Sequence, residues 1–212
     1  DDEKGFCFAS EFKALFRISR KPPEIDDIYT MLFMAKSSYP EDSTGDTFFQ
    51  GVRKLPPGNN LQVCVGSRTH VGSFWNLSDV KVSPQVRSSG EVIEELQHLL
   101  SDAVKLRLRA DVRVGSCLSG GIDSSGIVGL ATNHLAGVNA SAKFNTFSAV
   151  YESEGRYNEK YFIDLVSQHY KSASHYTFPT TEKLNRDLDR LVYHQEEPFS
   201  TTSIFAQWCV ME

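Results

Sequence analysis

The sequence lacks paired cysteines, long apolar runs and an excess of basic residues, and each lack excludes a class of protein. Cys7, Cys64, Cys117 and Cys209 lie far apart without a CxxC pair, so neither a zinc site nor a disulfide framework is indicated. No apolar run approaches the roughly 20 residues that span a bilayer. The net charge of -5 argues against nucleic acid or an anionic membrane as a partner, because both select clustered Lys and Arg.

The sequence also opens without an initiator Met and without a basic-then-apolar leader. It ends on Cys209-Val210-Met211-Glu212 without a helix-stop signal. We therefore expect a piece of a longer protein, cut at both ends, and the isolated cysteines favour a reducing cytoplasm. The composition is that of a globular protein: 212 residues, 40% hydrophobic and 23% charged, suffice for one large domain or two small ones.

The first part of the chain has the pattern of a β-rich α+β domain. Residues 5–16 are typical of a strand that runs into a short helix, and residues 23–38 predict a second helix with an apolar stripe. After a Pro-Pro-Gly turn, residues 61–65 alternate apolar and polar side chains, as a half-buried antiparallel strand does. Residues 77–88 are rich in Ser, Pro, Val and Lys without helical period, which predicts a linker between two domains.

The second part of the chain, residues 89–212, has the pattern of an α/β domain. A stripe of apolar residues at helical spacing begins after Ser88 and Ser89, either of which is suited to be the N-cap. Strands and helices then alternate, which predicts a parallel sheet covered by helices, with ligands beyond the carboxyl ends of the strands. We expect the strands at 112–118, 144–151 and 175–178, and the helices at 125–135, 158–170 and 181–194.

A loop of serines and glycines, Ser119-Gly120-Gly121-Ile122-Asp123-Ser124-Ser125, follows the first of these strands and opens a helix. At such a place a phosphate chain meets backbone N–H groups and the positive end of a helix dipole. The glycines let the backbone approach the anion, and the serines add hydroxyl donors. Asp123 would repel phosphates unless a Mg²⁺ ion lay between them, so the loop predicts a Mg²⁺-dependent nucleotide site.

This loop lacks the Lys of the Walker loop, which binds the β- and γ-phosphates of ATP. A loop without that Lys is better suited to hold pyrophosphate as a leaving group, after attack at the α-phosphate and with release of AMP. The simplest alternative is a tight strand-to-helix turn. That alternative explains Gly120 and Gly121 but not the serines and Asp123 together.

The stretch from Leu108 to Leu118, together with the loop, closely resembles the synthetase-domain signature of the asparagine synthetase family, members of the ATP pyrophosphatase (PP-loop) superfamily. Arg113 stands where the family usually has Pro, but it precedes the loop and removes no phosphate donor. Further stretches resemble the family in its own order: residues 8–15, 49–58 and 74–77 resemble its glutaminase domain, and residues 194–199 with Thr202-Ser203 another synthetase segment.

The resemblance implies a fold for each part of the chain. Residues 1–76 would be the end of a glutamine amidotransferase type 2 domain, which has an N-terminal-nucleophile glutaminase fold. Residues 77–88 would be the linker. Residues 89–212 would begin the ATP-binding domain, a parallel-sheet PP-loop domain of the adenine nucleotide α hydrolase-like kind.

The resemblance also implies an activity. In the family, the side-chain carboxylate of aspartate attacks ATP to give β-aspartyl-AMP and pyrophosphate, and ammonia released from glutamine then displaces AMP to give asparagine. Water must be kept away from the adenylate. The implied cofactors and partners are ATP, Mg²⁺, aspartate and glutamine or ammonia, and family members often form homodimers.

Carried over residue by residue, the family pattern assigns a nucleotide site. Mg²⁺ would be held through Asp123, and Leu118 would contribute to the nucleoside pocket. Ser148 and Ala149, at the end of the next strand, would contact adenine through the backbone. The residues implied to hold pyrophosphate are Ser119, Gly120, Gly121, Asp123, Ser124 and Ser125.

Two adjacent carboxylates, Glu196 and Glu197, occupy an Asp-Glu-Pro-Phe-like position of the family. A carboxylate there would orient the substrate amino group or ammonia, a catalytic role that we predict for Glu197 rather than Glu196. The alternative is a solvated helix end. His194 is interpreted as a C-terminal helix cap. Cys7 is expected to be a buried strand residue, because the glutaminase nucleophile of the family is an N-terminal cysteine with a free α-amine.

Other members of the superfamily remain as alternatives. A β-lactam-synthetase-like enzyme also adenylates a carboxylate but closes a ring instead of using ammonia, and other amidotransferases act on sugars or peptides. A degenerate homologue would keep the loop only for binding. Sulfur-transferring PP-loop proteins recruit reactive cysteines, for which Cys117 on a predicted buried strand is poorly placed.

Overall fold

A computed structural model divides the chain into two compact units: residues 1–84 with 192–200, and residues 85–191 with 201–212. Within the described residues, no helix is long and apolar enough to cross a membrane. The structure describes residues 5–19, 22–40, 43–64, 69–80, 87–138, 143–151 and 158–212.

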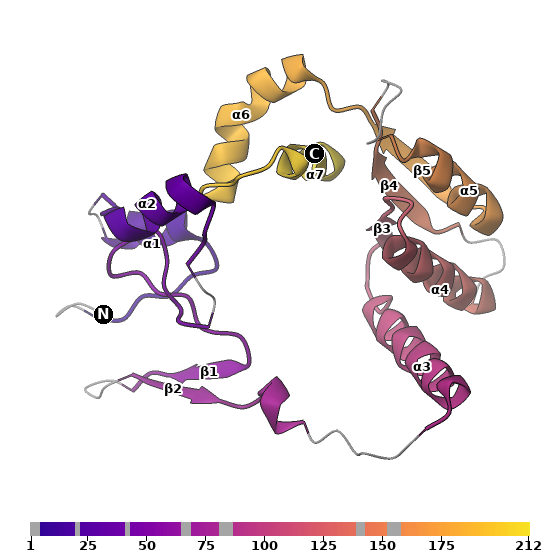
Figure 1. Cartoon of the computed structure of the whole chain (residues 1–212), viewed down its shortest axis with the longest axis horizontal. Helices are drawn as coiled ribbons and strands as arrows, with labels where there is room; N and C mark the ends of the chain where they lie inside the picture. The colour runs from indigo at the N-terminus through magenta and orange to yellow at the C-terminus, as the bar shows by residue number, and fades with distance from the viewer. Residues whose placement is uncertain are drawn as a thin grey trace. The chain divides into compact units, whose positions relative to one another are not determined.

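The first unit contains two short helices and an antiparallel hairpin, labelled in Figure 1. The second helix begins after Asp26, whose Oδ1 accepts the N–H groups of Ile28 at 3.0 Å and Tyr29 at 3.1 Å, as an N-cap does. β1 pairs with β2 from Asn59 opposite Ser73 to Gln62 opposite His70. The elements are α1 (Phe12–Ser19), α2 (Asp27–Lys36), β1 (Asn59–Gln62), β2 (His70–Ser73) and the 3₁₀-helix η1 (Leu77–Asp79).

Two groups of aromatic rings pack the first unit. The ring of Phe49 lies 5.1 Å from that of Phe12 and 4.9 Å from that of Phe16, both on α1. Edge-to-face contacts join Phe33 of α2 to Tyr39 at 5.2 Å and to Phe48 at 5.8 Å, and the rings of Tyr39 and Phe48 lie 6.2 Å apart. Phe48 is buried. These contacts hold α1, and the loops that follow α2, in fixed places within the unit.

The structure corrects the expected start of this unit. Residues 6–9 form no strand, and Cys7 is exposed rather than a buried strand residue. The helix expected at 23–38 is present as α2, and the short helix expected within residues 5–16 is present as α1, which extends to Ser19. Of the expected linker, residues 77–79 form η1, while residues 81–86 lie outside the described residues.

The second unit begins with α3 (Ser89–Arg107), and the structure selects Ser88 as its N-cap. The Ser88 hydroxyl accepts the N–H of Glu91 at 3.3 Å, and Glu91 Oε2 accepts the N–H of Ser88 at 2.9 Å. This reciprocal pair is a capping box. Val104 packs against the core of the unit, whereas the apolar residues nearer the start of α3, such as Leu96, are exposed.

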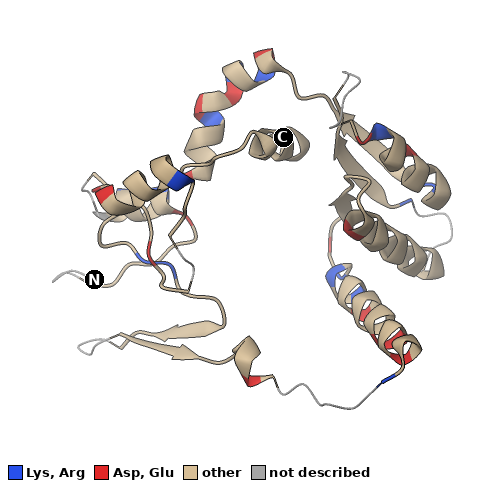
Figure 2. Cartoon of the chain, viewed as in Figure 1, with Lys and Arg blue, Asp and Glu red and all other residues tan. Residues whose placement is uncertain are grey.

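The remaining elements form a parallel three-stranded sheet with helices, so the predicted α/β alternation is confirmed. α7 was not predicted from the sequence. Figure 2 shows acidic and basic residues interspersed along α6. The strands are β3 (Gly115–Cys117), β4 (Asn145–Ala149) and β5 (Ala173–Thr177), in that order, and the helices are α4 (Ile122–Val138), α5 (Lys160–Tyr170), α6 (Thr181–Gln195) and α7 (Ser203–Met211).

The core of this unit lies on one face of the sheet, against α4 and α5, as Figure 1 shows. Alternate residues of β4 point to that face, so Thr146 and Ser148 are buried while Phe147 is 37% exposed. Cys117 and His175, the register partners of Phe147, are exposed on the other face. Cys117 is thus on the expected strand but not buried. The core consists of Leu118, Val128, Ala131, Phe144, Val150 and Ile163.

Candidate functional site

The serine- and glycine-rich loop is anchored at its start to the neighbouring strand. The N–H of Leu118 donates to the carbonyl of Phe147 at 2.9 Å, and the buried hydroxyl of Ser148 donates to the carbonyl of Leu118 at 2.6 Å. The side chain of Leu118 is only 2% exposed and lies in the core. The loop therefore leaves the sheet from a fixed point, and the side chain of Leu118 faces the core rather than solvent.

Gly120 is required both for the shape of the loop and for its packing. Its φ of +79° lies in the left-handed region, which favours glycine. A Cβ at this position would lie 2.8 Å from Cβ of Phe162 and 3.0 Å from the nitrogen of Ile163, both on α5. The turn can therefore hold its backbone against α5 only without a side chain.

The hydroxyls of Ser119 and Ser124 tie the loop to the first turn of α4. Their oxygens lie 3.0 Å apart, the N–H of Ser119 donates to Ser124 Oγ at 3.3 Å, and that hydroxyl donates to the carbonyl of Gly121 at 3.2 Å. The N–H of Ser125 donates to the same carbonyl at 3.0 Å, which closes the first turn. The first N–H groups of a helix have no acceptor within it, and the positive end of its dipole lies there. This end of α4 is thus an ordered place for an anion.

Asp123 is exposed in the first turn of α4. No group of three or more His, Cys, Asp or Glu side chains suited to a metal ion occurs in the part of the chain that the structure describes. A cation at this loop would therefore take one protein carboxylate and complete its shell with phosphate oxygens and water. Mg²⁺ is bound in this way in nucleotide sites, so the residues present fit the predicted ion.

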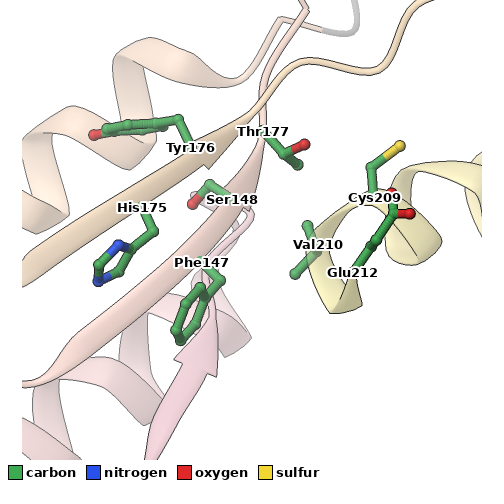
Figure 3. A pocket seen from close by; sticks show the side chains of 8 residues that line it. All are labelled: Phe147, Ser148, His175, Tyr176, Thr177, Cys209, Val210 and Glu212. Atoms are coloured by element: carbon green, nitrogen blue, oxygen red, sulfur yellow. The ribbon is translucent and has the colours of Figure 1, made fainter. Parts of the chain in front are cut away.

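A cavity of about 230 Å³ lies where β4 and β5 end, beside α7. Figure 3 shows Thr177 of β5 on the side of Cys209 and Val210 of the helix, whereas the side chain of Ser148 points away from them. Its other lining residues are Phe147, His175, Tyr176 and Glu212. The cavity thus adjoins the strand end at which Ser148 and Ala149 were predicted to contact adenine.

Comparison with known proteins identifies the family. The model of the Asparagine synthase family matches residues 95–212, which include the loop, the sheet and the cavity. The chain belongs to the asparagine synthase family.

The relatives of this family member include synthetases and one class of amidase. It is 30% identical, over its whole length and 39% of the relative, to "Putative asparagine synthetase (glutamine-hydrolyzing) 2" of Methanocaldococcus jannaschii. It is 27% identical to asparagine synthetase (glutamine-hydrolyzing) 1 of Bacillus subtilis, over 91% of the chain and 28% of the relative. It is 34% identical to amidase chry2 of Gibberella zeae, over 59% of the chain and 18% of the relative. The chain thus spans less than two fifths of the length of these relatives.

In this family member, Glu196 and Glu197 belong to the first compact unit, whereas the loop belongs to the second. Glu196 accepts the N–H groups of Phe12 at 2.9 Å and Lys13 at 2.7 Å. Its side chain is 12% exposed, so Glu196 is not the solvated helix end that we considered. Glu197 Oε2 pairs with Lys54 Nζ at 2.9 Å.

The pKa of Glu196 lies below its ordinary value. Burial alone would raise this pKa, but the backbone N–H groups of Lys13 and Phe12 and the ammonium of Lys13 outweigh the effect of burial. The carboxylate is therefore kept ionised by the groups that it binds.

The remaining predicted residues lie as follows. Ala149 is half-buried at the end of β4, and His194 lies in the last turn of α6, where a capping histidine was expected. The structure brings together all the predicted loop residues, and it joins Ser148 to Leu118 by a hydrogen bond. Sequence reasoning missed Lys13 and Lys54 as partners of the two glutamates, because those pairs join residues more than 140 positions apart.

Proposed function

We propose that the chain is part of a glutamine-hydrolysing asparagine synthetase, an ATP-dependent ligase that converts aspartate to asparagine. The observation that carries the proposal is the loop from Ser119 to Ser125. It joins β3 to α4 at the carboxyl edge of a parallel sheet and lacks the Lys of a Walker loop. The match over the whole chain to a relative that is named a glutamine-hydrolysing synthetase supports the same activity.

The domain assignment is part of this proposal. Residues 1–76 would end a glutamine amidotransferase type 2 domain, residues 77–88 would link it to the next, and residues 89–212 would begin the ATP-binding domain. The division of the structure between residues 84 and 85 and the family match from residue 95 support a boundary in this region.

The loop would bind the pyrophosphate end of ATP. The first N–H groups of α4 and the serine hydroxyls donate to phosphate oxygens, and Gly120 lets the backbone come close. Asp123 would hold Mg²⁺, which when bound supplies positive charge to the phosphates. Leu118 would contribute to the nucleoside pocket, and Ser148 and Ala149 would contact adenine through their backbone at the end of β4.

Glu197 is proposed to orient the substrate amino group or ammonia. Its Oε2 pairs with Lys54, while its Oε1 is buried and has no hydrogen-bond partner among the described residues. A buried carboxylate oxygen without a donor is unfavourable, so it would bind a cationic or N–H donor strongly. The unpartnered Oε1 therefore supports the proposed role of Glu197 in orienting the amino group or ammonia.

The carboxylate that is adenylated is the finer part of the proposal. A β-lactam-synthetase-like enzyme, or another amidotransferase that adenylates a different carboxylate, would use the same loop, and the match to amidase chry2 keeps this alternative open. Because all four cysteines are free thiols, we propose the cytoplasm as the location. A homodimer belongs to the same proposal.

The test uses the full-length parent protein with ATP, Mg²⁺, ammonia and a panel of carboxylates. Asparagine made from aspartate, lost in Asp123→Ala, is the expected result. If AMP forms only with a different carboxylate, the protein is a related ligase and not an asparagine synthetase. Nucleotide binding without turnover on any carboxylate would contradict an enzymatic role.

A further inference from the structure

The core-facing side of β4 carries two buried hydroxyl groups, those of Thr146 and Ser148. A buried hydroxyl is unfavourable unless it forms a hydrogen bond. The hydroxyl of Thr146 lies 3.3 Å from that of Ser172 and 3.4 Å from that of Ser174, at the start of β5. The hydroxyl of Ser148 instead donates to the carbonyl of Leu118 at 2.6 Å. The two groups therefore differ in their partners, and the hydroxyl of Ser148 binds where the nucleotide loop begins.

The backbone hydrogen bonds between β3 and β4 stop at Leu118. The N–H of Leu118 donates to the carbonyl of Phe147 at 2.9 Å. In a regular parallel ladder, the next bond would run from the N–H of Ala149 to the carbonyl of Leu118. Among the residues that the structure describes, no backbone hydrogen bond joins these two groups. The carbonyl of Leu118 accepts the Ser148 hydroxyl instead, so this side chain takes the place of a ladder bond.

The N–H of Ala149 points away from β5. The N–H of the next residue, Val150, donates to the carbonyl of Thr177 at 2.8 Å, at the end of β5. Successive N–H groups of a strand point to opposite sides, so the N–H of Ser148 also faces β5, whereas that of Ala149 faces the side of β3. β3 has already ended there, at Cys117. Of the two residues proposed to contact adenine through the backbone, Ala149 is therefore the one with its N–H on the side of the nucleotide loop.

We propose that Ser148 is a positioning residue, whose hydroxyl holds the carbonyl of Leu118 and thereby keeps the N–H of Ala149 open to the base of ATP. This inference rests on the proposed ATP-dependent function. A purine ring has nitrogen atoms that accept hydrogen bonds, and a single backbone N–H can fix the orientation of such a ring. A ligand without a base, such as pyrophosphate, does not use this N–H.

The same hydroxyl links the base contact to the pyrophosphate loop. Leu118 directly precedes Ser119, the first residue of the loop, and Ala149 directly follows Ser148. One hydrogen bond of 2.6 Å thus joins the two chain segments that are proposed to bind opposite ends of ATP.

Ser148→Ala should close the base contact. It removes the hydroxyl and leaves the carbonyl of the buried Leu118 without this donor. Because a buried carbonyl without a donor is unfavourable, we expect the N–H of Ala149 to pair with it and to extend the ladder by one bond. Binding of the base then requires this bond to break. The expected loss of ATP affinity is that of one hydrogen bond, about two- to tenfold.

Binding of Mg²⁺–ATP and of Mg²⁺–pyrophosphate to the full-length parent protein, measured by calorimetry, tests the inference. Ser148→Ala is expected to raise the dissociation constant of ATP about two- to tenfold and to leave that of pyrophosphate unchanged. Thr146→Val is the matched control, because it removes a buried hydroxyl of the same strand that bonds toward β5. It should bind both ligands as the wild type does.

Three results of this titration would overturn the role of Ser148. The first is unchanged ATP binding in Ser148→Ala. The second is an equal loss of affinity for ATP and for pyrophosphate, since this would show that the hydroxyl only anchors the loop. The third is the same selective loss of ATP affinity in Thr146→Val.

Hydrogen exchange of single amides in the wild-type protein tests the open N–H without any substitution. The Ala149 amide should exchange readily without ligand, be protected by Mg²⁺–ATP and not be protected by Mg²⁺–pyrophosphate. The Val150 amide, which is bonded to Thr177, should stay protected throughout. Protection of Ala149 in the absence of ligand would overturn the inference. If the wild type binds neither ligand, the proposed function fails, and slower exchange of Ala149 in Ser148→Ala than in the wild type still decides the role of the hydroxyl.

Discussion

Gly120 is the residue on which the geometry of the loop depends most. It has a positive φ, and a Cβ would meet the backbone of α5 at Ile163. We expect Gly120→Ala to lower the free energy of unfolding by about 1–3 kcal/mol and to weaken ATP binding. Urea unfolding and nucleotide titration measure the two effects.

Gly126 is the matched control for Gly120. It lies in α4, and a Cβ there would meet nothing within 4 Å. Gly126→Ala should raise the free energy of unfolding by about 0.5–1 kcal/mol, because Ala costs less than Gly in a helix. If both substitutions changed the free energy of unfolding equally, the positive φ and close packing of Gly120 would not matter for stability.

Asp187 predicts a dependence of stability on pH. The Arg186 guanidinium and the Lys183 ammonium, at 3.0 and 2.7 Å from its carboxylate, lower the pKa of Asp187 from 3.8 to about 2. A lowered pKa stabilises the folded state fully above pH 3.8, and this contribution is lost as the pH falls through about 2. The difference in melting temperature between wild type and Asp187→Asn should therefore shrink over this window. A constant difference would contradict the ionic role.

At the scale of the element, the start of α3 offers a direct comparison of two adjacent serines. The sequence allowed either Ser88 or Ser89 as the N-cap, and the structure gives that place to Ser88. Ser88→Ala should cost about 1 kcal/mol of unfolding free energy, measured by urea unfolding, while Ser89→Ala should change it little. A larger loss of unfolding free energy in Ser89→Ala than in Ser88→Ala would show that Ser89 is the N-cap.

The alternation of strands and helices in the second unit could be predicted, because it follows from the local spacing of apolar residues. The first and last residues of each element could not be predicted in this way. β3 keeps only Gly115–Cys117 of the expected 112–118, since its length is set by pairing with β4. The strand expected near Cys7 was wrong because apolar residues alone do not supply a pairing partner.

At the scale of the whole molecule, the residues of the loop could be predicted from the sequence, whereas the contacts of Glu196 and Glu197 could not. The loop from Ser119 to Ser125 is contiguous, so its chemistry could be inferred from neighbouring letters and from its place between strand and helix. The partners of Glu196 and Glu197 depend on contacts across the chain. No local pattern indicates such contacts, and only the folded structure supplies them.

The central claim, that the loop holds pyrophosphate as the leaving group, is tested most directly by the products of ATP cleavage. The full-length parent protein would be incubated with ATP, Mg²⁺, ammonia and aspartate, and all nucleotide products would be quantified. The account predicts AMP and pyrophosphate in equal amounts with asparagine, all lost in Asp123→Ala. ADP and inorganic phosphate as the products would contradict it.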